Sequence, residues 1–233
     1  MTTSWKDKLS DDEKTMLEKL TSRLQGAMKT FTQDGYAFVK TSSRSAKDAP
    51  MVQGRFKELY LAELSTYPED DRTENSQIFC LLKAAFEALK VKTADDVIDM
   101  FIRSERIYQD LLLAAVNQVE KYNEHFVIRK FVDIDVDMEF RGFVWGHELV
   151  ALSQFNYAIY SKRLVDEQER YKKMVKDYYE EKVRPKLEGT SFPQNSIIDF
   201  AVCENGKNIQ WFQVRKKNIL LLVCNINLLF VLE

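Results

Sequence analysis

The sequence has few of the residues that build disulfide frameworks and histidine-based sites. Its three cysteines, Cys80, Cys203 and Cys224, are far apart and form no CxxC pair. We therefore expect neither a disulfide framework nor a zinc site, and the composition fits a reducing compartment. With only two histidines, His125 and His147, the chain is a poor candidate for a histidine-based metal site or a catalytic triad.

The chain also has no strong charge of one sign and no common nucleotide or hydrolase motif. Its 34 basic and 36 acidic side chains nearly cancel, so bulk electrostatics recruits neither nucleic acid nor an anionic membrane. The N-terminal stretch MTTSWKDKLSDDEK is polar and acidic, unlike a signal peptide. No GxxxxGK[ST], GxGxxG or GxSxG motif occurs. The 233 residues, 45% of them apolar, fit one large or two small globular domains.

The hydrophobic periodicity that is present predicts an α+β chain. Ser10 and Thr93 are expected helix caps, and the long helical region from about 55 to 118 is expected to break near Ser104. After His125 the period changes from about 3.6 to 2. This change predicts strands at 125–134, 138–145 and 148–155, then a helix at 166–187 and a hairpin from 196–203 and 208–214. Gly146-His147 and Asn205-Gly206 are the expected turns.

Charged residues alternate with apolar ones along the central strands, and two interpretations remain open. Arg129, Lys130, Glu139 and Arg141 could line a solvated sheet face with cross-strand ion pairs, or they could form an anion site. The stretch FVKTSSRSAKDA, with Lys40 ending a strand before a hydroxyl-rich loop, suits phosphate oxygens or is simply a solvated loop. Asp199, between Ile198 and Phe200, either faces solvent or could hold Mg²⁺.

Four stretches occur in an order that is typical of one family. FVKTSSRSAKDA, LKVKTADDVIDMFIRSERIYQDL, FVIRKFVDIDVDMEFRGFVWGHELVALSQFNY and SIIDFAV resemble successive blocks of the cell division cycle protein 123 family. The resemblance runs from about Tyr36 to Phe212, and its central block is the most specific.

The resemblance implies an ATP-grasp-like fold with two lobes, a mainly antiparallel sheet, flanking helices and an incomplete C-terminal part. The expected divisions are an N-terminal helix (1–35), a mixed lobe with the phosphate loop (36–123), a sheet lobe (124–214) and a divergent apolar tail (215–233). The implied cofactors are ATP and Mg²⁺. The implied function is a cytoplasmic assembly chaperone for eukaryotic translation initiation factor 2, acting through its gamma subunit. The balanced charge and the short apolar tail predict that the chain binds neither nucleic acid nor membrane.

The resemblance also assigns roles to residues. Lys40, Ser42, Arg44 and Lys47 match the phosphate-contacting strand end and loop, and Arg141 matches an arginine near the phosphates. The adenine-lining hinge matches Val127, Ile128, Arg129, Lys130 and Phe131. Asp199 matches the first magnesium carboxylate. No side chain stands out as a nucleophile, so the sequence does not decide between a chaperone that only binds ATP and an ATP-grasp ligase that activates a carboxylate.

Three departures from the family pattern concern the same site. Phe131 replaces the usual tryptophan, and Phe155 replaces an arginine. Gln213 and Arg215 fall where acidic and amide groups would complete the metal site. The C-terminal stretch is interpreted as read-through past an exon end near Gln213, because Gln-Val-Arg at 213–215 is what a common splice-donor sequence would encode and the family resemblance stops near it. For the apolar tail from Asn218 to Leu232, a final strand and a membrane anchor are the alternatives. A nucleotide-deficient truncated isoform is therefore the third functional hypothesis.

Overall fold

The chain forms two compact units. The computed structural model describes residues 5–52, 54–116, 124–191, 193–203, 208–215 and 229–231. The N-terminal unit comprises Met1–Pro68 and Cys80–Val132, and the C-terminal unit comprises Glu69–Phe79 and Asp133–Glu233. Residues 124–132 thus belong to the first unit, although their strand-like pattern predicts that they group with the later strands. The mixture of helices and antiparallel sheets is the α+β class that the sequence predicts.

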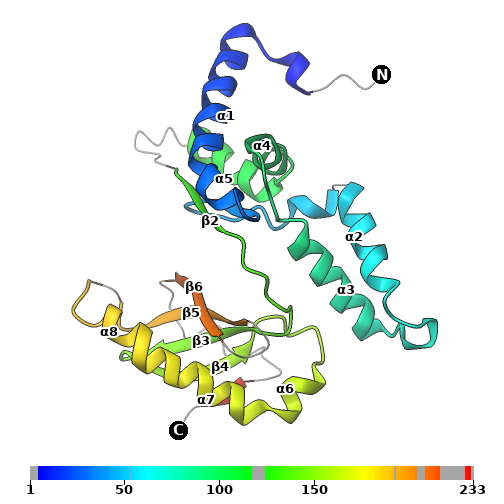
Figure 1. Ribbon diagram of the computed structural model, residues 1–233. Helices are drawn as coiled ribbons and strands as arrows, with labels where there is room; N and C mark the ends of the chain where they lie inside the picture. The colour runs from blue at the N-terminus through cyan, green and yellow to red at the C-terminus, as the bar shows by residue number, and fades with distance from the viewer. Residues whose placement is uncertain are drawn as a thin grey trace. The chain divides into compact units, whose positions relative to one another are not determined.

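Helices dominate the N-terminal unit (Figure 1). Its elements are the 3₁₀ turns η1 (Trp5–Lys8) and η2 (Ala49–Val52), helices α1 (Asp11–Thr32), α2 (Gly54–Leu64), α4 (Ala94–Ile102) and α5 (Glu105–Val116), and strands β1 (Ala37–Thr41) and β2 (Phe126–Lys130). Helix α3 (Glu74–Glu87) begins in the C-terminal unit, after the 3₁₀ turn η3 (Glu69–Asp71), and ends in the N-terminal unit.

Both predicted helix caps are confirmed. The Ser10 hydroxyl accepts from the Glu13 amide at 3.4 Å, and the Glu13 carboxylate accepts from the Ser10 amide at 2.8 Å. Thr93 and Asp96 form the same reciprocal capping box at the start of α4, with distances of 3.1 and 2.9 Å. Such caps satisfy backbone amides that the first helical turn leaves without partners.

Strand β2 pairs with β1 and not with β3, which corrects the expected grouping of the charged strands in one sheet. The two strands are antiparallel, in a register that runs from Ala37 opposite Lys130 to Thr41 opposite Phe126. Strand pairing is a non-local choice, and alternation within one strand does not reveal its partner. The N-terminal core lies where α1, β1 and α4 meet, and it includes Leu24, Met28, Phe38, Val39, Val97 and Ile98.

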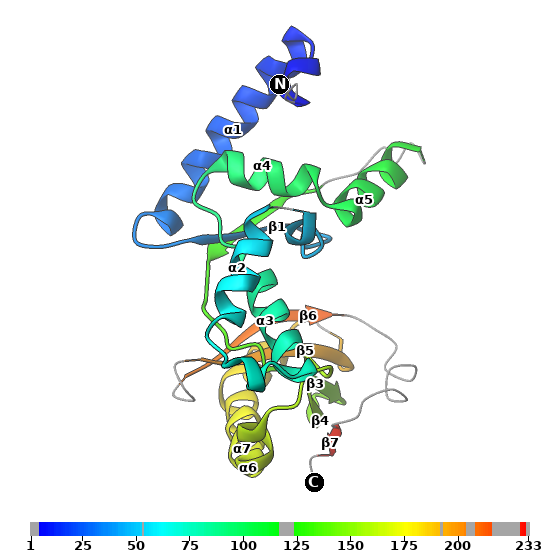
Figure 2. The ribbon, with the colours of Figure 1, turned by 90° about the vertical axis from the view of Figure 1, so that its right-hand side faces the viewer.

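The C-terminal unit is a five-stranded antiparallel sheet with helices along one face (Figures 1 and 2). The strand order is β6-β5-β3-β4-β7. The elements are β3 (Glu139–Trp145), β4 (Glu148–Gln154), α6 (Lys162–Asp166), α7 (Gln168–Tyr178), the π-helical turn η4 (Tyr179–Val183), α8 (Arg184–Leu187), β5 (Ser196–Cys203), β6 (Asn208–Arg215) and β7 (Leu229–Val231).

The predicted turn at Gly146-His147 joins β3 and β4. Trp145 pairs with Glu148, and both turn residues have positive φ, 58° for Gly146 and 66° for His147. Positive φ at both central residues is the requirement of a type I′ turn. The Tyr179 hydroxyl donates to the His147 carbonyl at 2.8 Å, and burial raises the pKa of Tyr179 to about 12, so the donor stays protonated. The Asn205-Gly206 turn lies outside the described residues.

The helix-covered face of the sheet is closely packed. Its core brings together Phe140, Leu152, Ile198 and Phe200 from the strands with Tyr171, Val175, Tyr179 and Val183 from the helical layer. Gly142 lies on this packed face of the sheet, where a Cβ would stand 2.7 Å from a ring carbon of Phe200 and 2.8 Å from a side-chain carbon of Leu149. A side chain at position 142 would therefore overpack the core.

The helix that crosses the sheet widens at η4 and then resumes as α8, which has Pro185 in its first turn. A proline lacks an N–H, and its ring collides with the carbonyl four residues earlier, here that of Glu181. The π-helical turn spans this carbonyl, so it accommodates the proline without ending the helix.

Only a short part of the apolar tail lies within the described residues. Leu229–Val231 forms β7 and pairs with β4, as the final-strand alternative predicts. The read-through interpretation begins near Gln213 at the end of β6, and most of its stretch, residues 216–228, lies outside the described residues. Among the described residues, none of the helices combines the length and the apolar character needed to cross a membrane.

Candidate functional site

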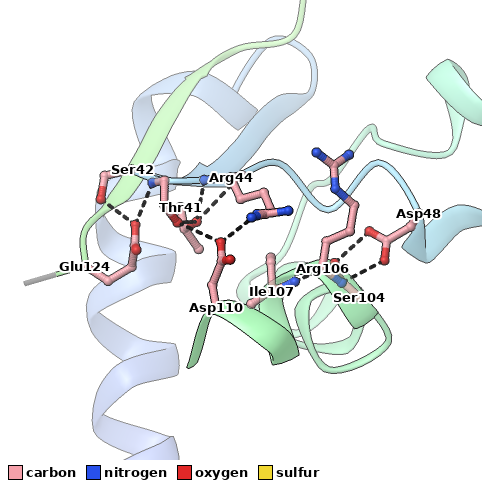
Figure 3. Close-up of polar contacts among 10 residues, drawn as sticks. Thr41, Ser42, Arg44, Asp48, Ser104, Arg106, Ile107, Asp110 and Glu124 are labelled. Carbon is pink, nitrogen blue, oxygen red and sulfur yellow. Dashed lines mark hydrogen bonds and ion pairs between the residues drawn. The ribbon is translucent and has the colours of Figure 1, made fainter. Parts of the chain in front are cut away.

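The hydroxyl-rich loop after β1 is folded into a compact turn (Figure 3). The amide and the hydroxyl of Thr41 both donate to the Arg44 carbonyl at 2.9 Å, and the Arg44 amide donates back to the Thr41 hydroxyl at 3.0 Å. Short polar side chains favour such local bonds with the backbone. The turn brings the donors of Ser42, Ser43 and Arg44 to one small area.

Two carboxylates from distant parts of the chain fill this area. Glu124 accepts from the Ser42 hydroxyl and, at 2.8 Å, from the Ser43 amide. Asp110 on α5 accepts from Arg44 Nε at 2.6 Å and from the Ser43 hydroxyl at 3.3 Å. These acidic partners were not predicted from the sequence, because they lie 66 to 82 residues away from the loop.

The far end of the loop is anchored to the start of α5. Asp48 accepts from the Ser104 hydroxyl at 2.7 Å and from the Arg106 amide at 3.0 Å, while the Ile107 amide donates to the Ser104 hydroxyl at 3.2 Å (Figure 3). Burial raises the pKa of Asp48, but these hydrogen bonds outweigh it and hold the pKa below its ordinary value. Asp48 therefore has a structural role that sequence reasoning missed.

Lys40 lies on β1, and the hinge residues 127–130 lie on the paired strand β2, which Phe131 directly follows. Lys40 stands opposite Val127, and Lys47 lies exposed within the loop. The Arg129 guanidinium lies 4.3 Å from the centre of the Phe38 ring. Phe131 is 8% exposed, with its ring centre 4.9 Å from that of Phe86.

The hinge side chains therefore differ in their access to a ligand. Phe131 is a core side chain, and Ile128 packs against the same core. Lys130 is exposed, and Val127 offers a 41% exposed apolar surface. Among the aliphatic and aromatic hinge residues, Val127 is thus the one most open to a planar ring.

Arg141 and Asp199 meet in the C-terminal unit. They are register partners on β3 and β5, and Arg141 donates to both carboxylate oxygens, from Nε at 2.8 Å and from a terminal nitrogen at 3.2 Å. The Asp199 side chain is 5% exposed and that of Arg141 22%. The interpretation of Asp199 as a solvated strand residue is therefore wrong, and the pair is a cross-strand ion pair within a largely buried environment.

The surroundings of this pair include two of the departures noted above. The Arg141 guanidinium lies 4.7 Å from the centre of the Phe155 ring, an arrangement that favours a cation–π contact. In the backbone register, Asp199 stands opposite Gln213 on β6. Arg129 belongs to the β1–β2 sheet, so the predicted grouping of Arg129 and Arg141 on one sheet is wrong.

A second buried carboxylate, Asp137, was not singled out from the sequence. It accepts from the Ser161 hydroxyl at 2.6 Å and from Arg163 Nε at 2.8 Å, and Arg163 also bonds Asp135 at 2.9 Å. Burial raises the pKa of Asp137, but the bonds from Arg163 and Ser161 outweigh it and leave the pKa lowered. These bonds connect the segment before β3 to the start of α6, so the cluster stabilises the fold of the C-terminal unit.

An apolar groove of about 540 Å³ opens on the N-terminal unit. It is lined by η1, α1, α4, α5 and the start of β2, through residues that include Met16, Leu20, Phe101, Ile102, Tyr108 and Leu111. Met16 is 64% exposed and Leu111 49%. Exposed apolar areas of this kind mark binding surfaces in soluble proteins.

Comparison with known proteins decides the family. The sequence profile named D123 matches residues 81–212, which is more than half of the chain. The chain belongs to the D123 family. The matched range includes the hinge, Arg141, Asp199 and both acidic partners of the loop, whereas Lys40 and the loop itself precede it.

The relatives of this D123 protein include one curated protein and two solved structures. The "Translation initiation factor eIF2 assembly protein" of Dictyostelium discoideum is 28% identical over 111 residues, which are 46% of this chain and 29% of the relative. Cdc123 from Schizosaccharomyces pombe matches 84% of this chain and 65% of its own, with a TM-score of 0.56 and 16% identity. A C-terminally truncated form of that protein matches with a TM-score of 0.58, 16% identity, and coverage of 84% and 66%. The chain thus covers less than two thirds of these relatives, and the structural likeness shows the fold alone.

Proposed function

We propose that this D123 protein is an assembly factor for eukaryotic translation initiation factor 2, that it acts through the gamma subunit, and that it binds ATP with Mg²⁺. The observation that carries the proposal is the sequence match to a relative named as an eIF2 assembly protein. The family match and the Cdc123-like fold support it. The ATP and gamma-subunit parts of the proposal come from the family resemblance.

The loop after β1 has the chemistry that a phosphate group requires. Ser42 supplies a hydroxyl, Lys40 and Lys47 supply ammonium groups, and Arg44 supplies a guanidinium. Such charge-assisted donors are the strong ones for phosphate oxygens. In the C-terminal unit, Arg141 is the proposed additional phosphate contact. Val127 and its β2 neighbours are proposed to line the adenine.

The described residues fit Mg²⁺ only in part. Asp199 is a carboxylate, as Mg²⁺ prefers, but both of its oxygens already accept hydrogen bonds from Arg141. Among the side chains that the structure describes, no group of three or more His, Cys, Asp or Glu could hold a metal ion. In this proposal Asp199 would hold the ion together with phosphate and water ligands, and the bound ion would supply charge neutralisation.

Replacing Lys40 with alanine is expected to weaken ATP binding by about 1–3 kcal/mol, because a charge-assisted contact to phosphate is lost. Isothermal titration calorimetry measures the effect. Lys57→Ala, which removes another exposed lysine from the same unit, is the control and should bind ATP normally. Unchanged ATP affinity in folded Lys40→Ala would exclude Lys40 from the site.

The gamma subunit is expected to bind the apolar groove of the N-terminal unit. The near-neutral net charge of the chain argues for a local contact surface over long-range steering. Leu111→Glu puts a charge into the groove at a half-exposed position and should weaken binding by at least tenfold, about 1.4 kcal/mol.

The control for the gamma-subunit experiment is Val165→Glu. Val165 is 50% exposed on α6 and lies outside the groove, so this variant should bind as the unmodified chain does. Pull-down of the isolated gamma subunit with equal amounts of each folded variant gives the comparison. Equal capture of both variants would reject the groove, and no capture by the unmodified chain would reject the partner.

The geometry of Asp199 supports a second candidate, a nucleotide-deficient assembly factor. Its carboxylate is engaged by Arg141, and an amide residue, Gln213, occupies the opposing register position. Calorimetric titration with ATP in the presence and absence of Mg²⁺ separates the candidates. Tight binding that depends on Mg²⁺ supports the first, and no binding together with gamma-subunit capture supports the second.

A further inference from the structure

The donors of the loop after β1 converge on carboxylate oxygens in the way that they would converge on phosphate oxygens. A single oxygen of Glu124 accepts from both the hydroxyl of Ser42 and the amide of Ser43. A single oxygen of Asp110 accepts from Arg44 Nε and the Ser43 hydroxyl. A backbone amide, hydroxyls and a guanidinium that meet on anionic oxygens form an anion site.

We propose that Glu124 and Asp110 act as a carboxylate latch, which occupies the phosphate-binding donors of residues 42–44 and must be displaced before a triphosphate binds. This inference rests on the proposed ATP function. It adds a regulatory step to the same loop, in which the protein carries its own competing anions.

The location of the two carboxylates explains how the latch would control access. Asp110 lies on α5, and Glu124 lies just before β2, so each reaches the loop from a different element. Asp48 anchors the other end of the loop to α5 through Ser104 and Arg106. The near end is also held, because the Ser42 amide donates to the His125 carbonyl at 2.8 Å and the His125 amide donates to the Ser42 hydroxyl at 3.2 Å. In this proposal the latch therefore opens by rotation of the Glu124 and Asp110 side chains, while the loop backbone stays in place.

Competition between the latch and the ligand follows from charge. A carboxylate attached to the same chain acts at high effective concentration, so it lowers the apparent affinity for an external anion that needs the same donors. A bound triphosphate would also be repelled by carboxylates left beside it. Neutralising the latch residues should thus increase the affinity for phosphate-bearing ligands, most clearly at low salt.

The test uses Glu124→Gln, Asp110→Asn and the double variant in the full chain. Each substitution keeps the side-chain size and removes one negative charge. Binding of ATP with Mg²⁺, and separately of inorganic tripolyphosphate, is measured by calorimetry at low salt. The double variant is expected to bind both ligands about tenfold more tightly than the unmodified chain, equivalent to about 1.4 kcal/mol.

The matched control is Glu105→Gln, which removes one negative charge from the exposed start of the same helix as Asp110. Its affinity should be unchanged, because Glu105 bonds Gln109 and none of the loop donors. An increase as large as that of Asp110→Asn would show a general charge effect and overturn the latch.

The remaining outcomes separate the latch from the ATP function. Weaker ATP binding by folded Glu124→Gln would overturn the latch, since Glu124 would then organise the loop for the ligand. If Lys40→Ala weakens ATP binding but the double variant binds as the unmodified chain does, the latch fails and the ATP function stands. A further outcome is that the double variant binds tripolyphosphate while the unmodified chain binds neither tripolyphosphate nor ATP. This result would support the latch and reject ATP binding by the unmodified chain. Absence of binding by every variant would overturn both.

Discussion

Replacing Arg141 with alanine is expected to lower the free energy of unfolding by about 3 kcal/mol. The substitution removes both hydrogen bonds to Asp199 and leaves a carboxylate that is 5% exposed without its cation. An unpaired buried charge costs more than the net contribution of the pair, because its desolvation is no longer offset. Urea denaturation at pH 7, followed by circular dichroism, measures the change.

The double variant Arg141→Met/Asp199→Leu tests the physical reason. Phe143, which shares a face with Arg141, packs with Ala151 and Ile197 in a small apolar cluster. An apolar pair at positions 141 and 199 should therefore be tolerated, with unfolding free energy within about 1 kcal/mol of the unmodified chain. If the double variant loses as much as Arg141→Ala, packing and not the unpaired charge determines the cost.

Replacing Arg163 with methionine is expected to cost about 2–3 kcal/mol at pH 7, because Asp137 keeps only the Ser161 hydroxyl among its side-chain donors. The cost should shrink in acid. The pKa of Asp137 is lowered in the folded chain, so its ionised form stabilises the fold above the ordinary value of about 4, and this contribution is lost as the pH falls through the lowered pKa.

Denaturation at pH 7 and at pH 3 measures both parts of this prediction. The control is Arg170→Met, which breaks the exposed ion pair with Glu167 near the start of α7. Exposed pairs contribute about 0–1 kcal/mol, so this variant should remain close to the unmodified chain at both pH values. A cost for Arg163→Met that is equal at pH 7 and pH 3 would contradict the assigned role of the Asp137 carboxylate.

Local features of this chain were accessible from the sequence because they depend on neighbours in the chain. The caps at Ser10 and Thr93, the break near Ser104 and the turn at Gly146-His147 are all confirmed. The alternation that separates Asp199 from Ile198 and Phe200 is also confirmed, since those two residues lie in the helix-covered core. Propensity, periodicity and turn chemistry were sufficient for each of them.

Non-local features were missed. The pairing of β2 with β1 depends on register between strands more than 80 residues apart, and nothing within either strand encodes it. In the sequence, Asp110 and Glu124 have no feature that distinguishes them from other charged residues. They come close to the loop only in the folded chain. Asp137 gave a weak signal, a carboxylate between apolar residues next to a predicted strand, but its partner Arg163 could not be identified from spacing.

The π-helical turn before Pro185 has a consequence for comparing homologous sequences. A π-helical turn contains one more residue than the α-helical turn that it replaces. The turn at Tyr179–Val183 is therefore what a single-residue insertion into an α-helix would produce. Tyr179 and Val183, at its two ends, both remain in the sheet-facing core. A homologue without a proline at the position of Pro185 could lose that extra residue and keep the same helix face on the sheet. An alignment that forbids a gap between Tyr179 and Pro185 would then shift every core position of α8 by about 100° around the helix axis.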